Sequence, residues 1–127
     1  MARFRIQYAR ERLKAARLLL GQRFFRDSSA RSCLSGLYSV WALLELNNVD
    51  CFHSSEVLER FCREPRGKDP EQTRISAPLR DLIEADLEER GGDFFQMDAE
   101  GAAYQYQNAE KILNEIERIF KARGIKL

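Results

Sequence analysis

The sequence is poor in reactive and metal-binding side chains. Its 127 residues include one histidine and three cysteines, and no two cysteines form a CxxC pair. Cys51, His53 and Cys62 lie near one another in sequence, but their spacing matches no standard zinc pattern, so we expect no metal site. An odd number of cysteines without a secretion signal indicates reduced thiols in the cytoplasm. No apolar run approaches the roughly 18–20 residues that span a bilayer, so we expect no membrane helix.

Strand patterns are also lacking, and helical periodicity takes their place. Helices are predicted over about residues 4–20, 28–46, 54–62, 78–91 and 99–123, with Asp27 or Ser28 capping the second and Asp98 the fifth. Pro78 is placed in the first turn of the fourth helix, and the proline-rich segment 64–73 is interpreted as an exposed loop. The predicted fold is therefore all-α, a single domain over residues 1–127 that forms an up-and-down bundle of four to five helices.

Two of these helices have distinctive faces. The second presents small residues, namely Ser28, Ser32, Ser35, Gly36 and Ser39. Glycine inside a helix costs about 1 kcal/mol relative to alanine, so Gly36 suggests that another backbone approaches closely, from the same subunit or a second one. The fifth carries an apolar stripe, namely Ala102, Tyr106, Ala109, Leu113, Ile116 and Phe120.

Charge is distributed unevenly although the net charge is only +1. Residues 1–31 hold nine Lys or Arg against two acids, and residues 81–100 hold eight Asp or Glu against Arg90 alone. A basic half can indicate an anionic partner. The simpler interpretation, which we favour, is that the two halves face each other within one subunit or across a dimer.

In the order of its helices and of several short segments, the chain resembles the small prokaryotic HEPN domains (higher eukaryotes and prokaryotes nucleotide-binding). The resemblance extends over about residues 4–120 and rests on the order of several short matches. These are 11–19 in the first helix, Arg31 and 41–44 in the second, the turn 53–57, the stretch 90–94, and Ala102 with 109–113 in the last helix. It implies a HEPN-like bundle that acts as a homodimer with a nucleotidyltransferase-like partner in a toxin–antitoxin or defence pair. It also implies a nucleotide or RNA ligand near Arg31, His53 and Arg90.

The departures from the family concern catalysis. Cys33 and Leu34 stand where the family has a tyrosine pair. The ribonuclease members place a histidine shortly after an arginine, but Arg90 is followed by Phe94, Phe95 and Gln96, and Arg31 by Ser35, Gly36 and Leu37. RNA cleavage needs one group to accept a proton and one to donate it. We therefore expect a binding protein without a cofactor rather than an enzyme.

Two alternatives remain open. One is a divergent metal-independent ribonuclease using Arg90, Asp93 and His53, and the other is a purely structural dimerisation or interaction domain. Each candidate also has a simpler interpretation: His53 caps or braces its turn, Arg31 is a surface arginine with a buried stem, and Arg90 and Asp93 form an ion pair at a helix end.

Overall fold

The computed structural model describes residues 2–63, 70–91 and 97–127, without the side chains of residues 62–63, 70–73 and 89–91. Its regular elements are α1 (Ala2–Gly21), α2 (Phe25–Leu46), a short 3-10 helix η1 (Ser54–Glu56), α3 (Val57–Arg63), α4 (Pro70–Gly91) and α5 (Ala99–Ala122). Every regular element in these residues is helical, which confirms the all-α prediction. No helix in this part of the chain is both long and apolar enough to cross a membrane.

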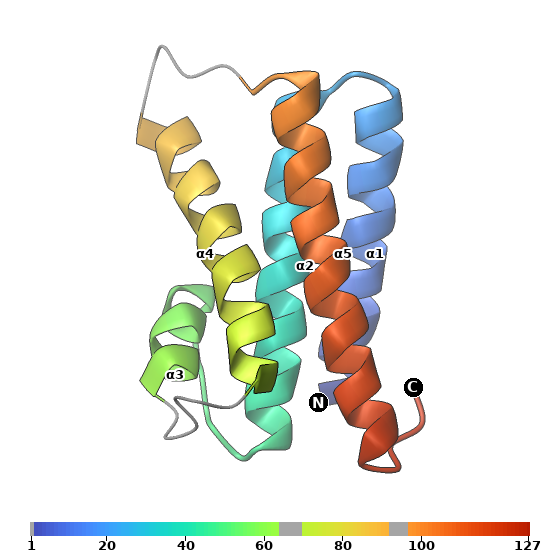
Figure 1. The fold of residues 1–127 in the computed structure, drawn as a ribbon, viewed down its shortest axis with the longest axis vertical. Helices are drawn as coiled ribbons and strands as arrows, with labels where there is room; N and C mark the ends of the chain where they lie inside the picture. The colour runs from blue at the N-terminus through green and yellow to red at the C-terminus, as the bar shows by residue number, and fades with distance from the viewer. Residues whose placement is uncertain (1, 64–69, 92–96) are drawn as a thin grey trace.

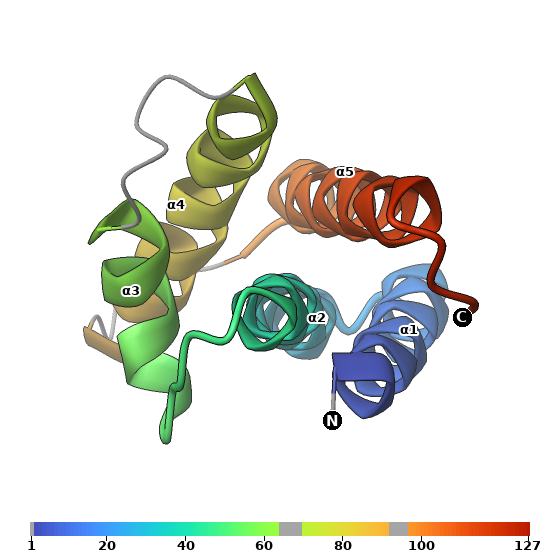
Figure 2. The ribbon, with the colours of Figure 1, turned by 90° about the horizontal axis from the view of Figure 1, so that it is seen from below.

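Helix α2 is the centre of the arrangement. The long helices α1, α2, α4 and α5 lie side by side, and the short α3 packs near the end of α2 and the beginning of α4 (Figure 1). Seen along the helices, α5 covers one side of the α1–α2 pair, while α3 and α4 lie on the other side of α2 from α1 (Figure 2). Helix α2 therefore contacts all four other helices.

The turn between α1 and α2 is held by its backbone. The Arg23 amide donates to the Leu20 carbonyl (3.1 Å) and the Phe24 amide to the Leu19 carbonyl (2.9 Å). Arg23 has a φ of 66°, so a non-glycine residue supplies the left-handed position of the turn. Helix α2 consequently begins earlier than predicted, and its N-cap residue Phe24 offers no side-chain hydrogen bond.

Asp27 or Ser28 was predicted to cap α2, and this is wrong because both lie inside the helix and Ser28 is buried against α1. Its hydroxyl donates to the Ala16 carbonyl (2.7 Å), and two turns on the Ser35 hydroxyl donates to the Ala9 carbonyl (2.8 Å). Ala9 and Ala16 are both fully buried. Small side chains on both helices therefore line the contact between α1 and α2.

Gly36 has a different reason for its small size. A Cβ atom at this position would lie 2.6 Å from Leu82 Cδ1 on α4 and 3.4 Å from Ile112 Cδ1 on α5. The groups that exclude a side chain at Gly36 are therefore apolar side chains of two other helices. The prediction that another backbone approaches closely at Gly36 is wrong at this position.

Helix α4 begins at Pro70, two turns before the predicted start. The prediction that residues 64–73 form a loop is therefore wrong for 70–73, and Pro78 lies inside the helix rather than in its first turn. Pro70 suits a first helical position because its missing N–H has no intrahelical acceptor there. The interior Pro78 removes one backbone hydrogen bond, but Ile75 and Leu79 on either side are fully buried. Tertiary packing of this face thus outweighs the local cost.

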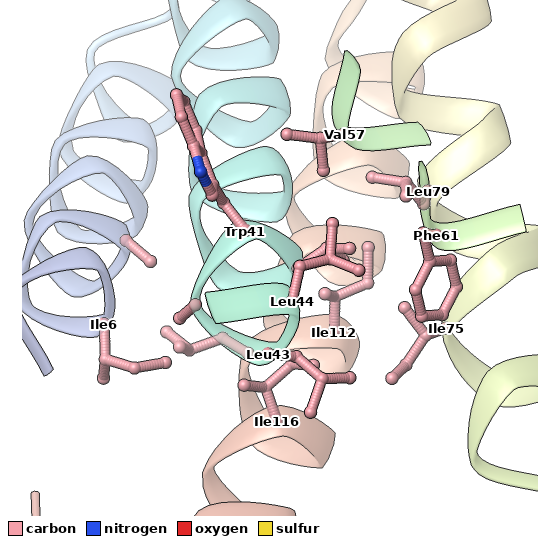
Figure 3. Close-up of a cluster of buried hydrophobic side chains, with 14 of the residues drawn as sticks. Ile6, Trp41, Leu43, Leu44, Val57, Phe61, Ile75, Leu79, Ile112 and Ile116 are labelled. Atoms are coloured by element: carbon pink, nitrogen blue, oxygen red, sulfur yellow. The ribbon is translucent and has the colours of Figure 1, made fainter. Parts of the chain in front are cut away.

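The hydrophobic core lies between α2, α4 and α5, with Phe61 and Val57 of α3 closing one side (Figure 3). The predicted cap of α5 is confirmed, because the Asp98 carboxylate accepts from the Gly101 amide (2.7 Å). The predicted stripe of α5 is buried except at Tyr106, which is only partly buried. A smaller cluster of Ala85, Met97 and Ala102 packs against Leu20 and Phe25 near the α1–α2 turn.

Candidate functional site

The predicted ligand residues come from three different parts of the chain. Arg31 is partly buried in the second turn of α2, and Arg90 belongs to the last turn of α4, with its side chain outside the described residues. These two turns lie at the same end of the bundle (Figure 1). His53 directly precedes η1, in the segment that joins α2 to α3. Asp93 lies outside the described residues. Among the described residues, His53 therefore comes just before η1 and α3, whereas Arg31 lies near the start of α2.

His53 is exposed, and its role in the turn comes from its backbone. Its conformation is extended, with φ −137° and ψ 147°, and its carbonyl accepts from the Glu56 amide (3.0 Å). The imidazole makes no capping hydrogen bond. Its neighbour Cys51 is buried, and this burial raises the pKa of the Cys51 thiol. Within the described residues no three His, Cys, Asp or Glu side chains are grouped to hold a metal ion.

A cavity of about 440 Å³ lies at the end of the bundle where α1 turns into α2, and we call it the end pocket. Its volume falls in the range of roughly 300–1,000 Å³ that is typical of small-molecule sites. The wall combines two cations, one acid, two aromatic rings and a thioether, namely Arg23, Phe24, Phe25, Arg26, Asp27 and Met97.

The wall of the end pocket mixes charged and apolar groups. The Arg23 guanidinium lies 5.5 Å from the centroid of the Phe25 ring, and Phe24 is 54% exposed. The first backbone amides of α2 open beside them without a side-chain cap from Phe24. Free amides at a helix N-terminus favour an anion. An anionic ligand with an apolar, planar portion would match the arginines and the aromatic rings of this wall.

A cluster of aromatic rings and arginines lies along α1 and α2, away from the end pocket. Ring contacts run from Phe4 to Tyr8 (5.3 Å between centroids), from Tyr8 to Tyr38 (5.2 Å) and from Tyr38 to Trp41 (5.9 Å, nearly parallel). Two arginines lie over these rings, because Arg5 is 3.7 Å from the Trp41 ring and Arg12 is 5.0 Å from the Tyr8 ring. Their cations interact with the ring faces in addition to any ion pair. We call this surface the outer face; it comprises Phe4, Arg5, Tyr8, Arg12, Arg31, Leu34, Tyr38, Trp41 and Glu45.

The outer face is directed away from α5. Residues two apart in a helix point about 200° apart. Gly36 faces Ile112 of α5, so Tyr38 points to the opposite side of α2. Arg31, Leu34, Trp41 and Glu45 follow Tyr38 at steps of three and four residues and therefore share its side.

Arg5 of α1 contacts two residues of α2 on this surface. Its Nε donates to Glu45 Oε1 (2.9 Å) while its guanidinium covers Trp41. Three buried polar atoms of this face have no hydrogen-bond partner among the described residues, namely Arg12 Nε, Trp41 Nε1 and Glu45 Oε2. Such atoms are uncommon in folded proteins and mark this surface as unusual.

The basic helix α1 finds its acidic partners on α2 and α5. Besides Arg5 and Glu45, Arg10 donates to Glu117 of α5 (2.9 Å). Helix α4, which holds much of the acidic segment, lies beyond α2, and no α1–α4 contact occurs between described residues. Among the described residues, the two halves therefore do not face each other through α1 and α4.

Comparison with family models, curated proteins and solved structures found no match to this chain. The function must therefore be inferred from the two surfaces themselves.

Sequence reasoning missed most residues of both surfaces. The outer face had a readable signal, because Arg5, Tyr8 and Arg12 recur at helical spacing, as do Tyr38 and Trp41. The end pocket had no such signal in the sequence, because it forms only where Met97 approaches the turn between α1 and α2.

Proposed function

We propose that this protein is a binding module whose end pocket holds a nucleotide or the phosphate of an RNA. The observation that supports this is the joining of Arg23 and Arg26 with Phe24 and the uncapped start of α2 in one cavity. Guanidinium groups suit phosphate because they donate paired hydrogen bonds. An exposed aromatic ring suits a base, because stacking tolerates any base.

Each wall residue then has a role. Arg23 and Arg26 would contact phosphate oxygens together with the first amides of α2, and Phe24 would stack on the base. Asp27 is an acceptor beside them and would take a hydrogen bond from a ribose hydroxyl or an exocyclic amine. Its negative charge also opposes phosphate, so the phosphate would lie on the arginine side of the cavity.

The setting of this activity is part of the proposal and comes from the family resemblance. A HEPN-type, up-and-down bundle of this kind would act in the cytoplasm as a homodimer, with a nucleotidyltransferase-like partner in a toxin–antitoxin or defence pair. Co-purification with such a protein encoded by a neighbouring gene would support this setting. Failure of the two purified proteins to associate would refute it.

The ligand is tested by titrating a labelled nucleotide and a short RNA into the protein at low salt. We expect Arg23→Gln to weaken binding by about 10- to 100-fold, because a hydrogen bond to a charged group contributes about 1.5–3 kcal/mol. Lys14→Gln removes the same charge from an exposed position on α1 outside the pocket and should change little. Affinity should also fall steeply with salt. No binding at low salt, or equal losses in both variants, would refute the pocket.

An interaction domain is the second candidate, and the outer face favours it. The ribonuclease alternative has no comparable support in the described residues. It is tested by incubating RNA with the wild type, His53→Ala and Arg90→Ala. Equal background cleavage by all three would end that alternative.

A further inference from the structure

The described wall of the end pocket carries one acid, Asp27, next to the two arginines Arg23 and Arg26. The Asp27 side chain is exposed, and its carboxylate makes no hydrogen bond or ion pair with any described residue. A carboxylate repels phosphate, because both groups are negatively charged. A phosphate site alone therefore does not account for an acid in this wall.

The usual task of an acid at this position is already taken by another group. Asp27 is the third residue of α2, where a side chain commonly reaches back to the backbone N–H of the N-cap residue. The N-cap residue here is Phe24, and its amide donates instead to the Leu19 carbonyl (2.9 Å). The Asp27 carboxylate consequently lies one turn from Phe24 on the same cavity wall, with both oxygens open to a ligand.

Two adjacent acceptor oxygens match the edge of one base. Guanine presents two neighbouring donors on its Watson–Crick edge, the N1–H and the N2 amino group. Adenine and cytosine present one amino donor beside the lone pair of a ring nitrogen, and uracil presents one N–H between two carbonyls. A carboxylate only accepts, so it takes two hydrogen bonds from guanine, whereas every other base sets a lone pair against one of its oxygens. This edge is accessible in a mononucleotide or in an unpaired nucleotide of RNA.

We propose that the end pocket selects guanine. The base stacks on Phe24, its N1–H and N2 amino group donate to the two carboxylate oxygens of Asp27, and Arg23 holds its phosphate. This inference rests on the nucleotide site of the proposed function and adds the identity of the base. The base, rather than the ribose, is the partner of Asp27 because the carboxylate lies beside the ring on which the base stacks.

Calorimetric titration at low salt with the monophosphates of guanosine, adenosine, cytidine and uridine (GMP, AMP, CMP and UMP) tests the base. We expect GMP to bind about tenfold or more tightly than each of the others, since one bidentate contact to a base gives discrimination of this size. Pentauridylates with one central guanosine or adenosine form a second arm. A guanosine preference in both arms places the guanine in RNA, and a preference for GMP alone places it in a free nucleotide. Both results support guanine selection.

Asp27→Asn tests the residue that reads the base. The new amide presents one acceptor and one donor, which match the amino group and N1 of adenine. We therefore expect the ratio of GMP affinity to AMP affinity to fall by about tenfold or more. The variant also loses repulsion of phosphate and an interaction with the helix dipole, but both effects act equally on the two nucleotides and cancel in the ratio. Glu11→Gln removes an acid from an exposed position on α1 and should leave the ratio unchanged.

Failure of the guanine inference can be distinguished from failure of the pocket. A wild type that binds no nucleotide at low salt would overturn the proposed function and guanine selection together. A wild type that binds all four nucleotides alike would overturn guanine selection alone. So would an Asp27→Asn variant that keeps the preference for GMP, as a contact between Asp27 and the ribose predicts.

Discussion

Gly36 is the position at which packing between helices can be tested most directly. An ideal Cβ there would lie 2.6 Å from Leu82 Cδ1, whereas two carbon atoms pack best at about 3.5–4.0 Å. Leu82 is only 1% exposed, and Ile112 and Leu79 stand at 3.4 and 3.9 Å from the same Cβ position. Gly36→Ala therefore requires a displacement of about 1 Å in a region with little free space.

Two opposing terms set the size of the effect. Overpacking a core costs about 1–3 kcal/mol. Alanine gains about 1 kcal/mol over glycine in helix propensity. We expect Gly36→Ala to lower the free energy of unfolding by about 1 kcal/mol. The measurement is urea denaturation followed by circular dichroism, with the m-value checked for a change in the unfolded state.

Gly21→Ala is the matched control. Gly21 is the last residue of α1, and nothing lies within 4 Å of its Cβ position. We expect this variant to be unchanged or slightly more stable, since the propensity term acts alone. Leu82→Ala should also cost less in the Gly36→Ala background than in the wild type, because the new methyl fills part of the cavity. The reasoning fails if Gly36→Ala matches or exceeds Gly21→Ala in stability.

Three further measurements test other parts of the structure. Hydrogen bonds from Arg118 and Arg74 lower the pKa of Glu115, so its stabilisation is present above the unfolded-state pKa and is lost as the pH falls through the folded value. Glu115→Gln should therefore be less stable at neutral pH by under about 1 kcal/mol, with a difference that shrinks in acid; a constant gap would contradict this. Alkylation followed by mass spectrometry should show Cys51 reacting slowly when folded and rapidly in urea, because burial raises the pKa of its thiol and shields it; fast labelling of the folded protein would disagree. Pro78→Ala should raise the free energy of unfolding by about 1–2 kcal/mol. An interior proline costs about 3 kcal/mol in the helix, and the stabilisation that it gives by restricting the unfolded chain is smaller. No gain in stability would mean that Pro78 belongs to a first turn.

Local signals were sufficient to predict that each helix exists, although α2 and α4 begin earlier than predicted. Asp98 was identified as a cap from its side chain, and the stripe of α5 from its spacing, because both depend on residues within a few turns. Tyr106 was assigned to the core on the same spacing, yet it is only partly buried. Periodicity indicates the side of a helix, but it does not show where the neighbouring helix stops covering that side.

The sequence by itself determined that this chain is helical, because periodic apolar residues with polar breaks allow no other regular structure to bury them. Only the tertiary structure decided what each face meets. Ser28 packs on α1 instead of capping α2, Gly36 makes room for Leu82, and Met97 reaches the α1–α2 turn to complete the end pocket. These pairings join residues far apart in sequence, and they depend on the order and tilt of the helices, which no local pattern encodes.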